Sequence, residues 1–169
     1  MIKLRNNYII SDPHFSHENI IKYSTRPFKN ADEMNEALIN NWNSVVTPSD
    51  TVYVLGDVAF KKNKLSILNL LNGRKILIPG NHDIYEVKEY LKYFDDVRGY
   101  MIKENIIFSH IPVHPDELLR FIGNIHGHLH EKTLNDKRYY SVCVEQINYT
   151  PILLDTAIQN LKLQVHEIK

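Results

Sequence analysis

Short apolar runs that stop abruptly at aspartate, asparagine or histidine recur along this chain of 169 residues. Residues 8–10 lead into Asp12, and residues 51–55 lead into Asp57. Such runs are typical of buried strands that end in polar loops. In an α/β sheet the carboxyl ends of the strands border one crevice, where ligands bind. We therefore expect side chains that are distant in the sequence to meet at a single site.

Helical signals separate most of the strands in the first half. Asn30 is a suitable N-cap for a helix over residues 31–46, in which Met34, Leu38 and Trp42 recur at helical spacing. Shorter helices are expected over residues 64–71 and 84–93, and a last one over residues 154–161, opened by Thr150 and Pro151.

The second half is richer in strands. Residues 100–103 and 106–109 flank Glu104-Asn105, a pattern that predicts a hairpin. The remaining strands are expected over residues 75–78, 123–126 and 139–144. Strands alternating with helices, followed by a β-rich half, indicate a single α/β domain over residues 1–169 with layered sheets.

Composition excludes several classes of protein. Hydrophobic residues make up 43% of the chain and charged residues 24%, as in ordinary globular domains. Lys and Arg together number 20, as do Asp and Glu, so bulk charge indicates neither a nucleic-acid nor a membrane surface. The single cysteine, Cys143, is expected to be a buried hydrophobe in a reducing compartment. With no signal-peptide pattern and no apolar run near ~18 residues, a cytoplasmic location without membrane contact is expected.

The side chains that follow the strands form a set of potential metal ligands. They supply two carboxylates, one amide oxygen and four imidazoles: Asp12, His14, Asp57, Asn81, His110, His128 and His130. A closed tetrahedral zinc site needs only four ligands, so this set suits two ions that share a carboxylate. Oxygen and imidazole donors without thiolate favour Mn²⁺, Fe, Zn²⁺, Ni²⁺ or Co²⁺ over Ca²⁺ or Mg²⁺.

The residues around these ligands suit such a site. In Asp12-Pro13-His14 and in His128-Leu129-His130, the ligands lie two residues apart and so on one side of an extended segment. A glycine precedes Asp57, Asn81 and His128, which permits a tight turn or a close backbone approach.

The ordered blocks at residues 12–14, 56–57, 80–83, 110 and 127–130 resemble the calcineurin-like metallophosphoesterases. The resemblance implies an αββα fold in layers, with two packed β-sheets flanked by helices. The short chain leaves little room for a cap domain. The resemblance assigns the first ion to Asp12, His14 and His130, the second to Asn81, His110 and His128, and the bridge between them to Asp57.

The resemblance also implies a reaction. Two divalent ions, with Mn²⁺ the first expectation, would hold a bridging hydroxide that attacks the phosphorus of a phosphate ester. His82 would face the substrate phosphate and donate a hydrogen bond or proton to the leaving oxygen, with Asp83 orienting its imidazole. The expected substrate is a small phosphate ester or a nucleotide, with phosphodiesters ahead of monoesters. A phosphomonoesterase or a protein phosphatase is the alternative.

Three further residues are candidates for substrate contact. His17 follows the first ligands and would contact substrate or cap the next helix. Arg26 would clamp a phosphate with two hydrogen bonds or remain a solvated surface charge. His114 lies four residues after His110 and is a weaker candidate.

Other classes of function remain open at this point. The same fold serves some relatives as a non-catalytic scaffold, but here each ligand position is filled by a competent residue. A single-zinc hydrolase or a metal-storage site would be insensitive to changes at Asp57 or Asn81. Nucleic-acid contact through the short basic run at residues 61–64 is not indicated by the overall charge.

Overall fold

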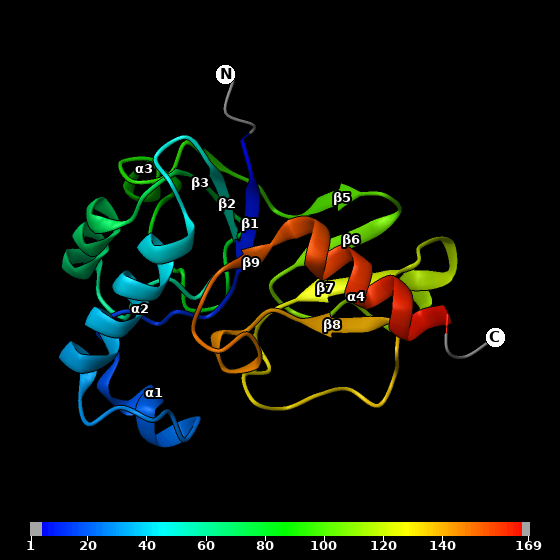
Figure 1. Ribbon diagram of the computed structural model, residues 1–169, viewed down its shortest axis with the longest axis horizontal. Coiled ribbons are helices and arrows are strands. Elements are labelled where there is room, and N and C mark those ends of the chain that lie inside the picture. Colours follow the sequence, from blue (N-terminus) through cyan, green and yellow to red (C-terminus); the bar gives the residue numbers. More distant parts are fainter. Residues whose placement is uncertain (1–4, 167–169) are drawn as a thin grey trace.

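The computed structural model describes residues 5–166, which form two mixed β-sheets flanked by helices (Figure 1). The first sheet has the strand order β4 (Asp96–Val97), β3 (Arg74–Leu77), β2 (Thr51–Val54), β1 (Asn7–Ile10) and β9 (Ile152–Leu153). The second has the order β5 (Met101–Lys103), β6 (Ile106–Ser109), β7 (Gly123–His126) and β8 (Tyr139–Ser141). The predicted layered α/β fold is confirmed.

The register of the parallel strands brings their carboxyl ends to a common edge. In the first sheet β1 pairs with β2 from Asn7↔Thr51 to Ile10↔Val54, and β3 continues in the same register. In the second sheet β6 and β7 are also parallel, with Ser109 opposite His126. The polar loops after all five strands therefore start close together, as the strand-end pattern predicts.

Side-chain alternation divides the interior into two main cores. In β1, Tyr8 and Ile10 face the core shared with α2 (Ala31–Val45), whereas Ile9 faces the core between the sheets. Each fully buried aliphatic side chain contributes about 1.5–3 kcal/mol to stability. The inter-sheet core also holds the apolar side chains of α4 (Leu154–His166), namely Leu154, Ala157, Ile158 and Leu161.

The helices agree with the sequence prediction only in part. The side chain of Asn30 accepts a hydrogen bond from the Glu33 amide at 2.9 Å, so the predicted cap of α2 is confirmed. The next segment is a 3-10 helix, η1 (Lys62–Leu70), and α3 (Val87–Tyr90) is much shorter than predicted. The remaining short helices are α1 (Glu18–Tyr23), η2 (Pro115–Arg120) and η3 (Val144–Gln146).

The C-terminal helix begins differently from the prediction. Pro151 leads into β9, which pairs with β1 through Tyr8↔Leu153, and α4 starts only after this strand. Thr150 and Pro151 are therefore not its cap, because pairing with β1 holds the segment extended. In the predicted hairpin, Glu104 and Asn105 adopt φ of 50° and 61°, the left-handed pair typical of a tight turn between antiparallel strands. No helix within residues 5–166 is long and apolar enough to cross a membrane.

Candidate metal centre

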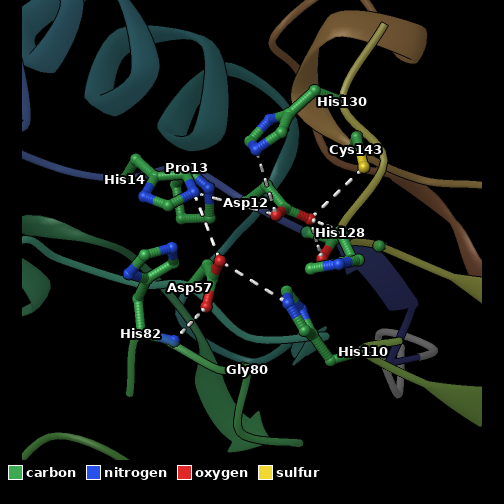
Figure 2. A network of polar contacts seen from close by, with 12 residues as sticks. Asp12, Pro13, His14, Asp57, Gly80, His82, His110, His128, His130 and Cys143 are labelled. Atoms are coloured by element: carbon green, nitrogen blue, oxygen red, sulfur yellow. Dashed lines mark hydrogen bonds and ion pairs between the residues drawn. The ribbon is translucent and has the colours of Figure 1, made fainter. Parts of the chain in front are cut away.

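The strand-end loops bring two groups of potential metal ligands together (Figure 2). In the first group, which we call site A, one ligand atom each from Asp12, His14 and His130 lie within 4.8 Å of one another. In the second, site B, the same holds for Asp57, His110 and His128. The sequence predicted these six residues as ligands, although residues 12 and 130 are at opposite ends of the pattern.

Asp57 lies between the two groups. Its Oδ2 is 3.4 Å from Nε2 of His14 and 3.5 Å from Nε2 of His110, so one oxygen faces both sites. Its Oδ1 accepts a hydrogen bond from the His82 amide at 2.9 Å. Burial alone would raise the pKa of this carboxyl, but the His14 and His110 rings and the His82 amide lower the pKa to about 2. The ionised carboxylate has the position expected of a bridging ligand.

The two oxygens of Asp12 have different surroundings. Oδ2 accepts hydrogen bonds from Ser11 Oγ at 2.6 Å and from the His128 amide at 2.8 Å, and Cys143 Sγ donates to it at 3.3 Å. Oδ1 and His14 Nε2 are buried without a hydrogen-bond partner among residues 5–166. Unsatisfied buried polar atoms are costly, and a cation would satisfy both. The donor set of site A thus fits a metal ion.

In each site, one histidine ligand has its Nδ1 held by an oxygen atom of the protein. Nδ1 of His110 lies 2.6 Å from the Leu55 carbonyl oxygen, and its Nε2 lies 3.0 Å from Oδ1 of Asn81. Nδ1 of His130 lies 3.1 Å from Oε1 of Glu145. Fixing one ring nitrogen directs the other to the ion, as in many metal sites. Asn81 thereby lies beside site B, and its role as a metal ligand stays a prediction.

The backbone at the ligands is strained. Left-handed φ values between 49° and 71° occur at Asp12, His14, Asp57, His128 and His130. This conformation costs a non-glycine residue about 1–2 kcal/mol. Such strain is concentrated at functional sites, where the surrounding structure imposes it.

The glycines before the ligands act mainly through close approach. A Cβ on Gly80 would collide with Oδ1 of Asp57, and one on Gly127 would collide with Oγ of Ser11. Gly56 combines both effects, with φ of 88° and the Gly80 backbone against it. Glycine allows the loops after β2 and β3 in the first sheet, and the loops after β1 and β7 in different sheets, to lie this close together.

His82 lies beside site A, and Asp83 binds backbone amides rather than the His82 ring. The His82 side chain is exposed, and its ring centroid lies 5.5 Å from that of His14 (Figure 2). Asp83 Oδ2 accepts hydrogen bonds from the amides of Asp57 at 2.7 Å and Gly80 at 2.8 Å, and its Oδ1 accepts one from Val58 at 3.1 Å. Asp83 therefore holds two strand-end loops together, and the prediction that it orients the His82 imidazole is wrong.

His17 lies beside site A. Its ring stacks on Phe60 with centroids 4.2 Å apart and planes 2° apart, and its centroid is 5.4 Å from that of His14. Burial, followed by the neighbouring histidines, lowers the pKa of His17 to about 4, so the ring is neutral at pH 7. The side chain forms no capping hydrogen bond to α1, which removes that alternative.

The other two candidates for substrate contact lie elsewhere. Arg26 is 4% exposed, and its guanidinium donates to the carbonyl oxygens of Asp12 at 2.8 Å and Pro13 at 2.9 Å. It supports the ligand loop from inside and cannot clamp a substrate phosphate as predicted. The side chain of His114 is 73% exposed and accepts a hydrogen bond from the Asp116 amide at the start of η2. It lines a different pocket, so the structure does not bring it to the metal centre.

An open pocket borders site A, His17 and His82. Its wall consists of His14, His17, Ile20, Tyr23, Ser24, His82, His128, Leu129, His130, Glu131 and Lys132. One side is therefore formed by imidazoles, and another by apolar side chains of α1 and the loop after β7. Sequence reasoning missed Glu145 and the apolar wall. A carboxylate within the otherwise apolar stretch after Tyr139 was the one available signal for Glu145.

Comparison with known proteins agrees with this geometry. Residues 8–164 match the model of the family described as calcineurin-like phosphoesterase. The chain belongs to this family. Its two ligand groups and the aspartate between them accord with the divalent metal ions that the family implies.

Relatives of this phosphoesterase occur in distant organisms. An uncharacterized protein, MJ1445, of Methanocaldococcus jannaschii is 40% identical over 94% of this chain and 92% of the relative. The Gene 66 protein of Mycobacterium phage L5 is 33% identical over 47% of this chain and 41% of the phage protein. The crystal structure of AQ665, a protein of unknown function from Aquifex aeolicus, has a TM-score of 0.74 and 32% identity, covering 94% of this chain and all of that one.

Proposed function

We propose that this calcineurin-like phosphoesterase is a phosphodiesterase that uses two divalent transition-metal ions, with Mn²⁺ as the preferred pair. The observation that carries the proposal is the carboxylate oxygen of Asp57 that faces His14 and His110 at 3.4 and 3.5 Å. A single shared oxygen between two ligand groups suits a pair of ions better than one ion. It is also the arrangement required for hydrolysis that needs both ions.

The ligands would hold the metal ions, and the residues of the pocket would contact the substrate. Asp12, His14 and His130 would hold one ion, and Asn81, His110 and His128 the other, with Asp57 shared. When bound, the ions supply Lewis acidity and water activation next to the substrate phosphorus. The exposed imidazole of His82 faces the same pocket and donates a hydrogen bond or a proton to the leaving oxygen. The neutral ring of His17, which stacks on the ring of Phe60, contacts the bound ester.

Phosphodiesters are favoured because the pocket is open. The side chains of Asn81 and His82 are exposed, which leaves space for the second ester group of a diester. The apolar wall formed by Ile20, Tyr23 and Leu129 suits an organic substituent rather than water. Lys132 on the same wall favours the alternative, a phosphomonoesterase, because a lysine ammonium attracts a phosphate dianion. We further propose a cytoplasmic location, because the free buried thiol of Cys143 fits a reducing compartment.

Hydrolysis by metal-stripped protein tests the proposal. Bis-p-nitrophenyl phosphate and p-nitrophenyl phosphate would be offered after addition of Mn²⁺, Ni²⁺, Zn²⁺ or Mg²⁺. We expect turnover that depends on metal, is highest with Mn²⁺ and is faster for the diester. Faster turnover of the monoester would favour the alternative. Failure of every metal, despite two bound ions per chain, would favour a non-catalytic scaffold.

A further inference from the structure

A buried ion pair lies directly behind site A. Arg26 and Glu145 are 119 residues apart in the sequence, and their side chains are 0% and 5% exposed. Nη2 of Arg26 lies 2.7 Å from Oε1 of Glu145, and Nε donates to the same oxygen at 2.9 Å. We propose that this pair is a positioning device that orients His130 and fixes the Asp12 turn for metal binding at site A. The inference rests on the metal centre of the proposed function and names a residue pair that supports one of its two ions.

The pair contacts two parts of site A at once. Oε1 of Glu145 lies 3.1 Å from Nδ1 of His130, which leaves Nε2 of that ring facing Oδ1 of Asp12 at 3.9 Å. Arg26 donates to the carbonyl oxygens of Asp12 and Pro13 at 2.8 and 2.9 Å. These carbonyls flank the turn where Asp12 and His14 adopt left-handed φ values of 59° and 49°. Glu145 thus fixes the His130 side chain, and Arg26 fixes the strained backbone at Asp12 and Pro13.

Stability alone does not explain this pair. Removing two charges from water is expensive, and replacement of a buried ion pair by apolar side chains of similar volume is often neutral or stabilising. A carboxylate behind a metal-binding imidazole, by contrast, fixes its tautomer and raises its basicity. Arg26 holds that carboxylate in place through two contacts to Oε1, since it offers a cation with a planar set of donors.

Site B contains a natural comparison. The ring of His110 is also held from behind, but its partner is the neutral carbonyl oxygen of Leu55 at 2.6 Å. Among residues 5–166, the side chains of Arg26 and Glu145 form hydrogen bonds with each other, with Asp12 and His130 of site A, and with Pro13 and Met34. Loss of the pair is therefore expected to affect the ion at site A and to spare the ion at site B.

Metal binding to single-site proteins tests the inference. In a His110→Ala background only site A stays complete, and in a His130→Ala background only site B does. We expect Glu145→Gln to weaken Mn²⁺ binding about 10- to 100-fold in the first background and to leave it unchanged in the second. Titration calorimetry or the Mn²⁺ electron paramagnetic resonance signal measures the affinity without any substrate. Asp136→Asn, which breaks the Asp136–Arg138 pair on the surface, is the matched control and should change neither affinity.

A second variant distinguishes a loss of metal affinity from a failure to fold. The double change Arg26→Met and Glu145→Leu removes both charges together, so neither stays buried and unpaired. We expect it to fold, with circular dichroism like that of the parent, and to lose site A affinity as Glu145→Gln does. Unchanged affinity in either variant, or equal weakening at both sites, would overturn the inference. Failure of the unaltered chain to bind Mn²⁺ at site A would do so as well. Binding without hydrolysis would refute only the proposed function.

Discussion

Sites A and B use similar ligands but differ in what surrounds them. In site A, Asp12 and His14 are 0% and 2% exposed, and a buried ion pair stands behind His130. In site B, Asp57 and His110 are buried as well, but Asn81 is exposed, and the partner of the His110 ring is a neutral carbonyl. The difference teaches that two sites with similar ligands and similar burial can differ in the charge that supports their imidazoles, although the ligand types in the sequence do not distinguish them. We expect site A to bind its ion more tightly, because a carboxylate rather than a neutral carbonyl supports its His130 imidazole.

Replacement of the shared ligand should have the largest effect. Asp57→Asn removes the negative charge whose oxygen faces His14 and His110. We expect hydrolysis of bis-p-nitrophenyl phosphate to fall below detection and Mn²⁺ affinity to fall at both sites, as measured by calorimetry. Retention of full affinity at one site would break the comparison, since it would assign Asp57 to the other site alone.

Removal of the His82 imidazole should affect neither ion. We expect His82→Ala to keep both Mn²⁺ ions and to lose about 10²- to 10⁴-fold in turnover, the usual contribution of a general acid. The loss should be greater for an alkyl ester than for a p-nitrophenyl ester, because a poor leaving group needs the proton more. Equal losses for both esters would argue against the acid role.

A change at Asp83 should act on site B through the backbone. Its carboxylate accepts hydrogen bonds from the amides of Asp57, Val58 and Gly80, so Asp83→Asn leaves one or more buried donors poorly satisfied. We expect the free energy of unfolding of the metal-free protein to fall by about 1–3 kcal/mol in urea titrations. Mn²⁺ affinity should fall more at site B, which contains Asp57 and Asn81, than at site A. An unchanged free energy of unfolding would contradict this role.

Lowering the pH should destabilise the metal-free protein, because His17 is neutral in the folded state. Its pKa is about 4 in the folded chain and 6.5 in the unfolded chain, so between these values only the unfolded state binds the proton. The metal-free protein should therefore lose stability as the pH falls from about 6.5 to 4, with no further contribution from this group below pH 4. His17→Gln should reduce this slope in urea titrations at several pH values. An identical slope in the variant would show that other histidines account for it.

The strand-end pattern predicted much of the centre because it depends on a simple geometric rule. Parallel strands in register end at the same edge, so Asp12, Asp57 and Asn81 follow from where β1, β2 and β3 end. Element types were harder to predict. Residues 62–70 form a 3-10 helix, and Pro151 precedes a strand rather than a helix because pairing with β1 outweighs the local capping signal.

The roles of Arg26 and Asp83, which support the ligands without binding metal or substrate, were mispredicted for a different reason. Arg26 has the features of a phosphate clamp in the sequence, and its true partner, Glu145, is 119 residues away. Asp83 follows His82 directly, yet its carboxylate binds backbone amides 25 and 26 residues before it in the chain. Neither the direction of a side chain nor the donor that it meets is encoded in its near neighbours.

By itself, the sequence determined the ligand types, their order along the chain and the ends of the strands that carry them. Those features follow from hydrophobic periodicity and from donor chemistry, both of which are local. Only the tertiary structure decided which ligands face each other, which lie in strained turns and which are supported by a charge. These properties depend on the packing of two sheets and on long-range hydrogen bonds, and packing selects among conformations that the local sequence leaves equally open.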